Sequence, residues 1–264
     1  MLGAIIGDVV GRPHARQKTL DFELIIPDSC WTENTVFLLG TADCLLYGGD
    51  YGDCYQRWYQ WYPDIETVYG KSFADWASAD SLRPYYSCRH DGAMRAVPVA
   101  YAFDNLKDVM AEAERSALAT HNHPEGIQGA QATAAAVFLA KAGATKAAMV
   151  ELLTSVFDYD LKTSYEQLQP GYRFSELAQD TVPAAIIAFL ASTDFEDALR
   201  KAVGLGGDAG TLAAITGGIA EAFYHRVRPG LRQPVWKLLD ESQQDLLLAF
   251  KSEFAADITL AIAA

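Results

Sequence analysis

Three short polar segments carry side chains that could hold an anion or a cation. They are residues 27–34 (Pro-Asp-Ser-Cys-Trp-Thr-Glu-Asn), 120–126 (Thr-His-Asn-His-Pro-Glu-Gly) and 204–211 (Gly-Leu-Gly-Gly-Asp-Ala-Gly-Thr). An apolar stretch with helical spacing follows each one, so each is expected to open a helix. Helix N-termini attract anions, and carboxylate and hydroxyl oxygens bind hard divalent cations. If the three helix starts converge, they form a cleft suited to phosphate and such a cation.

The same residues also have purely structural interpretations. Thr32 and Asp208 are ordinary N-cap residues, and Glu33 would then stabilise the helix dipole. The glycines of 204–210 can serve only to allow turns. His121 and His123 are two positions apart in a turn, whereas zinc ligands on one helix face are three or four apart. A zinc site is therefore not expected there, and a polar loop with capping histidines is the structural alternative.

His90 and Asp91 could act as a general base if the carboxylate fixed the imidazole tautomer, although chain neighbours rarely point together. A surface loop or an altered ligand pocket is the alternative. Cys88, beside Arg89 and His90, is a better candidate for a reactive thiol than Cys30, for which we expect no basic neighbour. The four cysteines contain no Cys-x-x-Cys pair, which excludes a zinc ribbon and a thioredoxin-like motif.

Helices must position these segments, because period-two alternation is almost absent and no strand is expected. We predict an all-α fold, a compact helical bundle forming one domain over residues 1–264. Helices are expected over 35–47, 104–120, 129–142, 145–157, 181–192, 194–203, 211–224 and, as one or two helices, 234–254. Loops are expected over 7–16, 27–34, 83–95, 120–129, 165–180 and 204–211.

The composition narrows the classes of function. Half of the 264 residues are hydrophobic and 21% are charged, which excludes a disordered chain. The formal charge of −13 disfavours nucleic acid and anionic membranes as partners. A small anionic ligand remains compatible, because backbone amides bind phosphate within acidic proteins. Neither a basic leader nor an apolar run long enough to span a membrane is visible, so a cytoplasmic location is expected.

Taken in order, several segments resemble the ADP-ribosylglycohydrolase family, in its short bacterial branch. The similarity extends to about Tyr224 and rests on residues 1–11, 21–24, 31–35, 92–95, 120–126 and 206–214. The resemblance implies an all-α fold and hydrolysis of the glycosidic bond that joins ADP-ribose to a protein side chain or small acceptor. It also implies two magnesium or manganese ions held between the helix-opening loops.

The resemblance assigns roles to individual residues. Glu33 and Asp208 take the catalytic positions. The metal-binding positions fall on Thr32, Glu33, Asn34, Asp208 and Thr211. The substrate-binding positions fall on His90, Asp91, Gly92, His121, Asn122, His123, Pro124, Glu125, Gly126 and Tyr172. Tyr165 and Phe174 fall with Tyr172 in a loop where family members place aromatic groups near the nucleotide.

The sequence departs from the family pattern where metal would bind. The family's Thr-Asp-Asp is Thr32-Glu33-Asn34 here, and its Asp-x-Asp-Thr is Asp208-Ala209-Gly210-Thr211. Ala15 replaces a glutamate, and residues 89–92 (Arg-His-Asp-Gly) replace Gly-Asn-Gly-Ser. A magnesium ion needs several oxygen ligands at about 2.0–2.1 Å. We therefore expect no dinuclear centre, and at most one weakly held magnesium or manganese ion.

Three hypotheses about function follow. The first is a diverged protein whose cleft binds ADP-ribose or a related nucleotide-sugar, with the family's hydrolase activity weak or lost. The second is an active hydrolase that cleaves an N- or O-glycosidic ADP-ribosyl bond with one metal ion or none. The third is an interaction protein with a vestigial cleft. The expected partner is an ADP-ribose-like small molecule or an ADP-ribosylated substrate, and the sequence leaves the oligomeric state open.

Overall fold

The computed structural model describes residues 1–63 and 69–255, and every regular element in them is a helix. Within this part of the chain no strand forms, and a single isolated bridge joins Arg89 to Leu177. The predicted all-α fold is therefore confirmed. No helix in the described ranges is long and apolar enough to cross a membrane.

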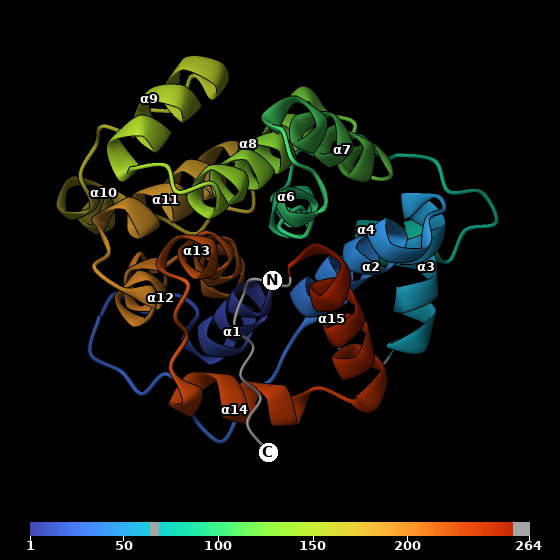
Figure 1. The fold of residues 1–264 in the computed structure, drawn as a ribbon, viewed down its shortest axis with the longest axis horizontal. Helices are drawn as coiled ribbons and strands as arrows, with labels where there is room; N and C mark the ends of the chain where they lie inside the picture. The colour runs from blue at the N-terminus through green and yellow to red at the C-terminus, as the bar shows by residue number, and fades with distance from the viewer. Residues whose placement is uncertain (64–68, 256–264) are drawn as a thin grey trace.

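The helices follow one another closely along the chain (Figure 1). Their bounds are α1 Leu2–Gly11, η1 (a 3₁₀ turn) Arg12–His14, α2 Glu33–Tyr47, α3 Tyr51–Trp61, α4 Lys71–Ala77, α5 Asp91–Met94, α6 Val99–Ala102, α7 Leu106–Leu118, α8 Pro124–Lys141, α9 Lys146–Phe157, α10 Tyr165–Gly171, α11 Ala178–Ala191, α12 Phe195–Gly204, α13 Ala209–Tyr224, α14 Pro229–Leu238 and α15 Glu241–Phe254.

Each helix predicted from the apolar spacing is present, with its ends shifted by a few residues, and 234–254 divides between α14 and α15. The loop expected over 7–16 is wrong in its first part, because α1 continues to Gly11. Short helices also interrupt the loops expected over 83–95 and 165–180. The sequence pattern missed α3, which is rich in Tyr and Trp and begins at the N-cap Asp50.

Glycines on α1 explain how this helix approaches α13. Gly3, Gly7 and Gly11 recur every four residues and so lie on one helix face. A Cβ atom on Gly7 would lie 1.9 Å from the carbonyl oxygen of Ala213, and one on Gly11 would lie 2.1 Å from that of Ala209. The two helices therefore pack backbone against backbone and run antiparallel, which brings the end of α1 to the start of α13.

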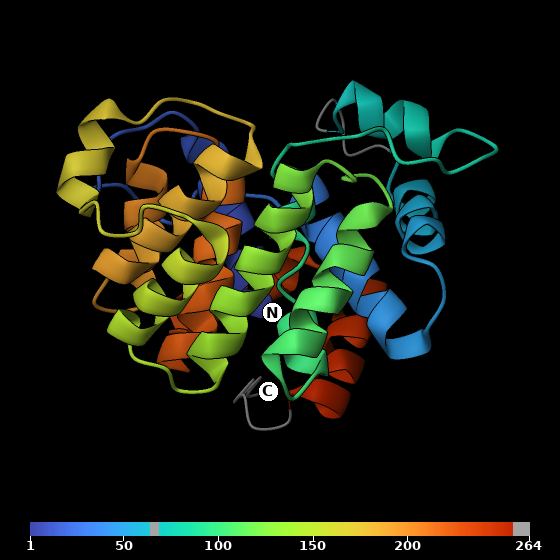
Figure 2. The same cartoon turned by 90° about the horizontal axis from the view of Figure 1, so that it is seen from above.

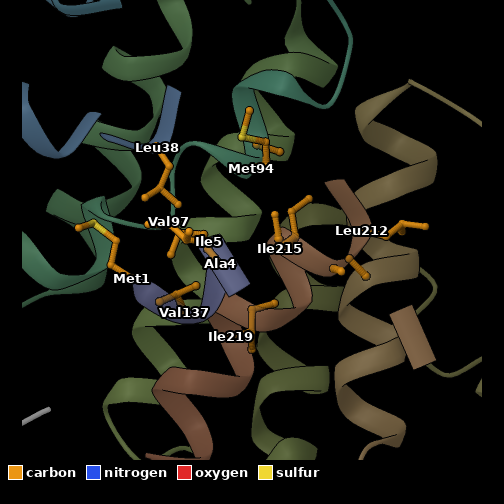
Figure 3. Packing of buried hydrophobic residues seen from close by; sticks show 14 of the residues in the cluster. Met1, Ala4, Ile5, Leu38, Met94, Val97, Val137, Leu212, Ile215 and Ile219 are labelled. Atoms are coloured by element: carbon orange, nitrogen blue, oxygen red, sulfur yellow. The ribbon is translucent and has the colours of Figure 1, made fainter. Parts of the chain in front are cut away.

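The pair of α1 and α13 lies inside the bundle (Figures 1 and 2). Helices α8, α11 and α12 pack against α13, and α2 and α14 pack against α1. Figure 3 shows Ile5 of α1 near Val97 and Ile215, and all three side chains are fully buried. This core fixes the starts of α2 and α13 relative to the last turns of α1.

Candidate active site

Asp8 is the point at which α1 meets the start of α2. Its Oδ1 accepts hydrogen bonds from Thr32 Oγ1 (2.6 Å) and Asn34 Nδ2 (3.3 Å). Its Oδ2 accepts from the amide (2.8 Å) of Thr32 and from the hydroxyl (2.7 Å) and amide (3.3 Å) of Thr35. Burial raises the pKa of Asp8, and these hydrogen bonds oppose that effect. The N-terminus of α2 is thus occupied by a carboxyl side chain of the protein itself.

The start of α13 joins the same place. Asp208 is the N-cap, and its Oδ1 accepts a hydrogen bond from the amide of Thr211. A Cβ atom on Gly210 would lie 3.4 Å from Asn34 Nδ2, 3.7 Å from Asp208 Oδ1 and 3.8 Å from Asp8 Oδ1. Four of the positions that the family resemblance assigned to metal binding, Thr32, Asn34, Asp208 and Thr211, are therefore gathered around Gly210.

Glu33 follows the N-cap Thr32 and lies among other acids. Burial, followed by the charge of Asp8, raises its pKa to about 9, and Asp91 and Asp208 act in the same direction. Its Oε2 is buried and makes no hydrogen bond. Glu33 and Asp91 line a pocket of about 220 Å³ whose other walls include Phe37, Phe73 and Arg89.

His90 and Asp91 do not pair with each other, so the adjacent general-base pair does not form. His90 Nδ1 lies 2.9 Å from Thr181 Oγ1, and its Nε2 lies 3.5 Å from Asp208 Oδ2. Asp91 Oδ2 lies 3.6 Å from His121 Nε2. Burial alone would raise the pKa of Asp91, but His121 and His90 hold that pKa far below its ordinary value. The two histidines, both buried, thus link different acids.

The segment that opens α8 divides into an inner and an outer part. His121 is buried, and a Cβ atom on Gly92 would lie 3.0 Å from its ring. Asn122 instead accepts a hydrogen bond from the amide of Tyr86 at 2.8 Å.

His123 caps the amide of Glu125, and its ring meets the edge of Tyr86. Pro124 is the first residue of α8, and Gly126 packs against Ser87 and His121. We call Asp8, Glu33, Asp91 and Asp208 the acid cluster. Of the six substrate-binding residues predicted over 121–126, only His121 contacts it, through Asp91, and the contacts of Asn122, His123, Glu125 and Gly126 are with other residues.

Tyr172 lies next to the start of α13, close to Asp208. A Cβ atom on Gly207, the neighbour of Asp208, would lie 2.6 Å from the Tyr172 ring. The Tyr172 hydroxyl is buried without a hydrogen-bond partner, and burial raises its pKa to about 12. Tyr172 also lines a cavity of about 930 Å³ together with Phe174. Tyr165 does not lie in a loop, because it begins α10.

The donor set does not fit a pair of divalent cations. Protein donors already occupy both oxygens of Asp8, Asn34 directs its amide nitrogen at Asp8, and Gly210 has no side chain. Within residues 1–63 and 69–255, no three His, Cys, Asp or Glu side chains converge as metal ligands would. Among the residues assigned to metal, Glu33 Oε2 is the one buried carboxyl oxygen without a hydrogen-bond partner. The expectation of at most one weakly held ion stays a prediction.

Sequence reasoning missed Asp8, and it misjudged Cys30. Asp8 is the one charged residue among the ten of α1, the other nine being apolar or small, and a lone buried acid in such a run needs partners. That signal was available, and it would have pointed to the start of another helix. Cys30 does have a basic neighbour, because Arg12 Nη1 lies 2.7 Å from its sulfur. Cys88 has no comparable contact among the described residues, and its predicted reactivity stays a prediction.

The buried histidine makes folding stability depend on pH. Burial lowers the pKa of His121 from 6.5 to about 4. Between these values the unfolded chain binds the proton and the folded one does not, so His121 destabilises the fold progressively as the pH falls from 6.5 to 4. We expect about 3 kcal/mol of such loss.

Chemical unfolding of wild type and His121→Gln at pH 7, 5.5 and 4.5 tests this expectation. The variant should show the shallower decline, and the partly exposed His123→Gln should follow wild type. Parallel declines for all three proteins would contradict the assignment.

The fold and this cluster can be compared with known proteins. The family model described as ADP-ribosylglycohydrolase matches residues 1–256, and the chain therefore belongs to the ADP-ribosylglycohydrolase family. A solved structure described as an ADP-ribosylglycohydrolase-related protein complex superposes with a TM-score of 0.74. The two sequences are 25% identical, and the superposition covers 96% of this chain and 95% of the solved chain.

Two relatives show the same level of similarity. An ADP-ribosylarginine hydrolase, Tri1, from Pseudomonas putida is 26% identical over 85% of this chain and 69% of its own length. An uncharacterized protein from Archaeoglobus fulgidus is also 26% identical, over 84% of this chain and 85% of its own length. The family resemblance drawn from the sequence motifs is thus confirmed.

Proposed function

We propose that this protein binds ADP-ribose or a related nucleotide-sugar in the cleft around Asp208 and Asp91, and that its hydrolase activity is weak or lost. The observation that carries the proposal is the state of Asp8. Its two oxygens accept five hydrogen bonds from Thr32, Asn34 and Thr35, so protein donors hold the start of α2 and Asn34 directs its amide nitrogen at Asp8. Chemistry that needs two metal ions is not supported by such a donor set.

The space around the acid cluster supports retention of a ligand. Glu33 and Asp91 line the pocket of about 220 Å³, and Tyr172, whose ring packs against Gly207 beside Asp208, lines the cavity of about 930 Å³. Tyr172 supplies a buried aromatic ring with an unsatisfied hydroxyl, which suits a nucleoside. Arg89 lines the smaller pocket but is paired with Asp91 (3.3 Å) and Glu176 (2.5 Å). An anionic ligand would compete for that guanidinium.

Calorimetric titration of ADP-ribose in EDTA and in magnesium tests the proposal. We expect saturable binding in both, with dissociation constants that agree within about threefold, because no metal ion bridges ligand and protein. Release of ADP-ribose from an ADP-ribosylarginine substrate should be slow or undetectable under conditions in which the Pseudomonas putida hydrolase acts. Absence of binding would favour the interaction protein with a vestigial cleft. Robust magnesium-dependent turnover would overturn the proposal.

One observation favours the second candidate, a hydrolase that works without metal. Glu33 and Asp91 line one pocket, and the free Oε2 of Glu33 has no protein partner. Two carboxyl groups that face a glycosidic bond can act as acid and base. Turnover that persists in EDTA and is abolished by Glu33→Gln would identify this function.

A further inference from the structure

A recess separate from the candidate active site lies at the C-terminal end of α2. It has a volume of about 770 Å³ and is enclosed by the last turns of α2, the end of α3 and the first half of α15. Helix α15 packs along α2 (Figure 1). Glu33 begins α2 and Tyr47 ends it, so at 1.5 Å per residue about 20 Å separate the recess from the acid cluster. The proposed function makes no use of this region.

Aromatic side chains form one wall of the recess. Tyr47 and Trp61 are 70% and 57% exposed, and both line this recess. Beneath them Trp58 and Tyr62 stack with ring centroids 5.6 Å apart and an interplanar angle of 16°. The floor is therefore rigid, and the two exposed rings stand at its rim.

Aspartates form the other wall. Asp240 caps α15 through the amide of Gln243 (2.9 Å) and accepts a hydrogen bond from the Tyr62 hydroxyl (2.7 Å). Asp245 lies one turn further along and is exposed. Neither aspartate has an ion pair with a lysine or arginine in the described part of the chain. Asp240 and Asp245 thus line the recess without a cationic partner among the described residues, while the nearby Arg57 pairs with Asp43.

An arginine of the protein itself already stacks on the aromatic wall of the recess. The guanidinium of Arg57 lies over the Trp61 ring, 5.8 Å from its centroid, and Arg57 Nη2 pairs with the carboxylate of Asp43. A planar guanidinium stacks on an aromatic face while it donates hydrogen bonds to a carboxylate. Asp43 is the carboxylate partner of Arg57. Asp240 and Asp245 can pair in the same way with a second guanidinium from another molecule.

We propose that this recess binds an arginine side chain on a basic segment of a partner protein. The exposed rings of Tyr47 and Trp61 would stack on the guanidinium, and Asp245 and Asp240 would accept its hydrogen bonds. Charge complementarity decides among occupants, because an uncharged sugar would stack on the rings but leave both aspartates without a counter-charge. Lysine is less suited, since its ammonium is compact and strongly hydrated.

An acetylated pentapeptide, Gly-Arg-Gly-Arg-Gly, tests the proposal in 150 mM NaCl, which screens distant surface charges. Its matched control carries citrulline, which has the shape of arginine without the charge. We expect the arginine peptide to shift the indole N–H resonance of Trp61 saturably, and the citrulline peptide to leave it unchanged. Trp61→Ala should weaken binding, followed calorimetrically, about fivefold and Asp245→Asn about threefold.

Glu253→Gln is the matched control variant, since it removes an exposed carboxylate from the same helix outside the recess. It should bind like wild type, and thermal unfolding should show that all three variants are folded. Absence of saturation by about 5 mM arginine peptide would overturn the proposal. So would equal binding of the citrulline peptide, equal weakening by Glu253→Gln and Asp245→Asn, or a response of the Trp61 resonance to an uncharged oligosaccharide alone.

Discussion

A chain that carries Ala15→Glu, Asn34→Asp and Gly210→Asp together is expected to bind manganese or magnesium at least about tenfold more tightly than wild type. A side chain on Gly210 would start 3.7 Å from Asp208 Oδ1 and 3.8 Å from Asp8 Oδ1, distances that need no rearrangement of the backbone. Asn34→Asp replaces the amide that now donates to Asp8 with a second carboxylate. Two carboxylate groups are thereby added where α1, α2 and α13 meet.

The same substitutions should make the stability of the fold depend on metal. Without a cation, the new carboxylates lie beside Asp8 and Asp208 and repel them, so we expect the variant to unfold about 2 kcal/mol more easily than wild type in EDTA. Manganese should restore that loss, because a ligand that binds only the folded state stabilises it. Thermal unfolding with and without manganese measures both effects, and recovered release of ADP-ribose would show that the cleft still positions the substrate.

Neutral substitutions separate charge from shape. Asn34→Asp with Gly210→Asn should gain less affinity than Asn34→Asp with Gly210→Asp, although both add a side chain of the same size at position 210. Ala15 is exposed and lies beyond η1, so Ala15→Glu alone should add little. If the triple variant bound manganese no more tightly than wild type, the position of Gly210 beside Asp8 and Asp208 would be contradicted. Two tightly bound ions in wild type would contradict the conclusion that the residues around Asp8 do not fit a pair of divalent cations.

The sequence was sufficient for most of the fold because the apolar spacing that defines a helix face is local. It failed where stability depends on a distant partner. Helix α1 contains three glycines, which weaken an isolated helix, and its formation depends on packing against Ala209 and Ala213 of α13. Helix α3 likewise carries Tyr, Trp, Gly and Cys residues of weak helix preference, and Tyr51, Cys54, Tyr55 and Trp58 are buried in a helix that packs against α2.

The candidate site could be predicted as a set of segments but not as a set of contacts. Polar residues before apolar helices located Thr32, Asp208 and His121 at the starts of α2, α13 and α8, where the structure has them. The pairing of His90 with Asp208 and of His121 with Asp91 depends on how α5 and α8 pack, which no local pattern encodes. Such contacts decide whether the acids of a cleft are free to bind a cation.

Among glycine-to-alanine substitutions in this chain, Gly7→Ala is expected to lower the free energy of unfolding most. Its Cβ would lie 1.9 Å from the carbonyl oxygen and 2.3 Å from the carbonyl carbon of Ala213, and backbone atoms cannot move aside as a side-chain tip can. Helix α1 must separate from α13, so we expect a loss of about 3 kcal/mol or more in the free energy of unfolding. Asp8 is the next residue, and the separation should also weaken binding of ADP-ribose.

The matched control is Gly230→Ala, another helical glycine. Nothing lies within 4 Å of the added methyl group there, and alanine favours a helix over glycine. We therefore expect Gly230→Ala to equal or exceed wild type in urea unfolding, while Gly7→Ala unfolds at a lower urea concentration and binds ADP-ribose less tightly. Equal midpoints for the two variants would show that α1 does not need its close approach to α13, and the position of Asp8 would then require another explanation.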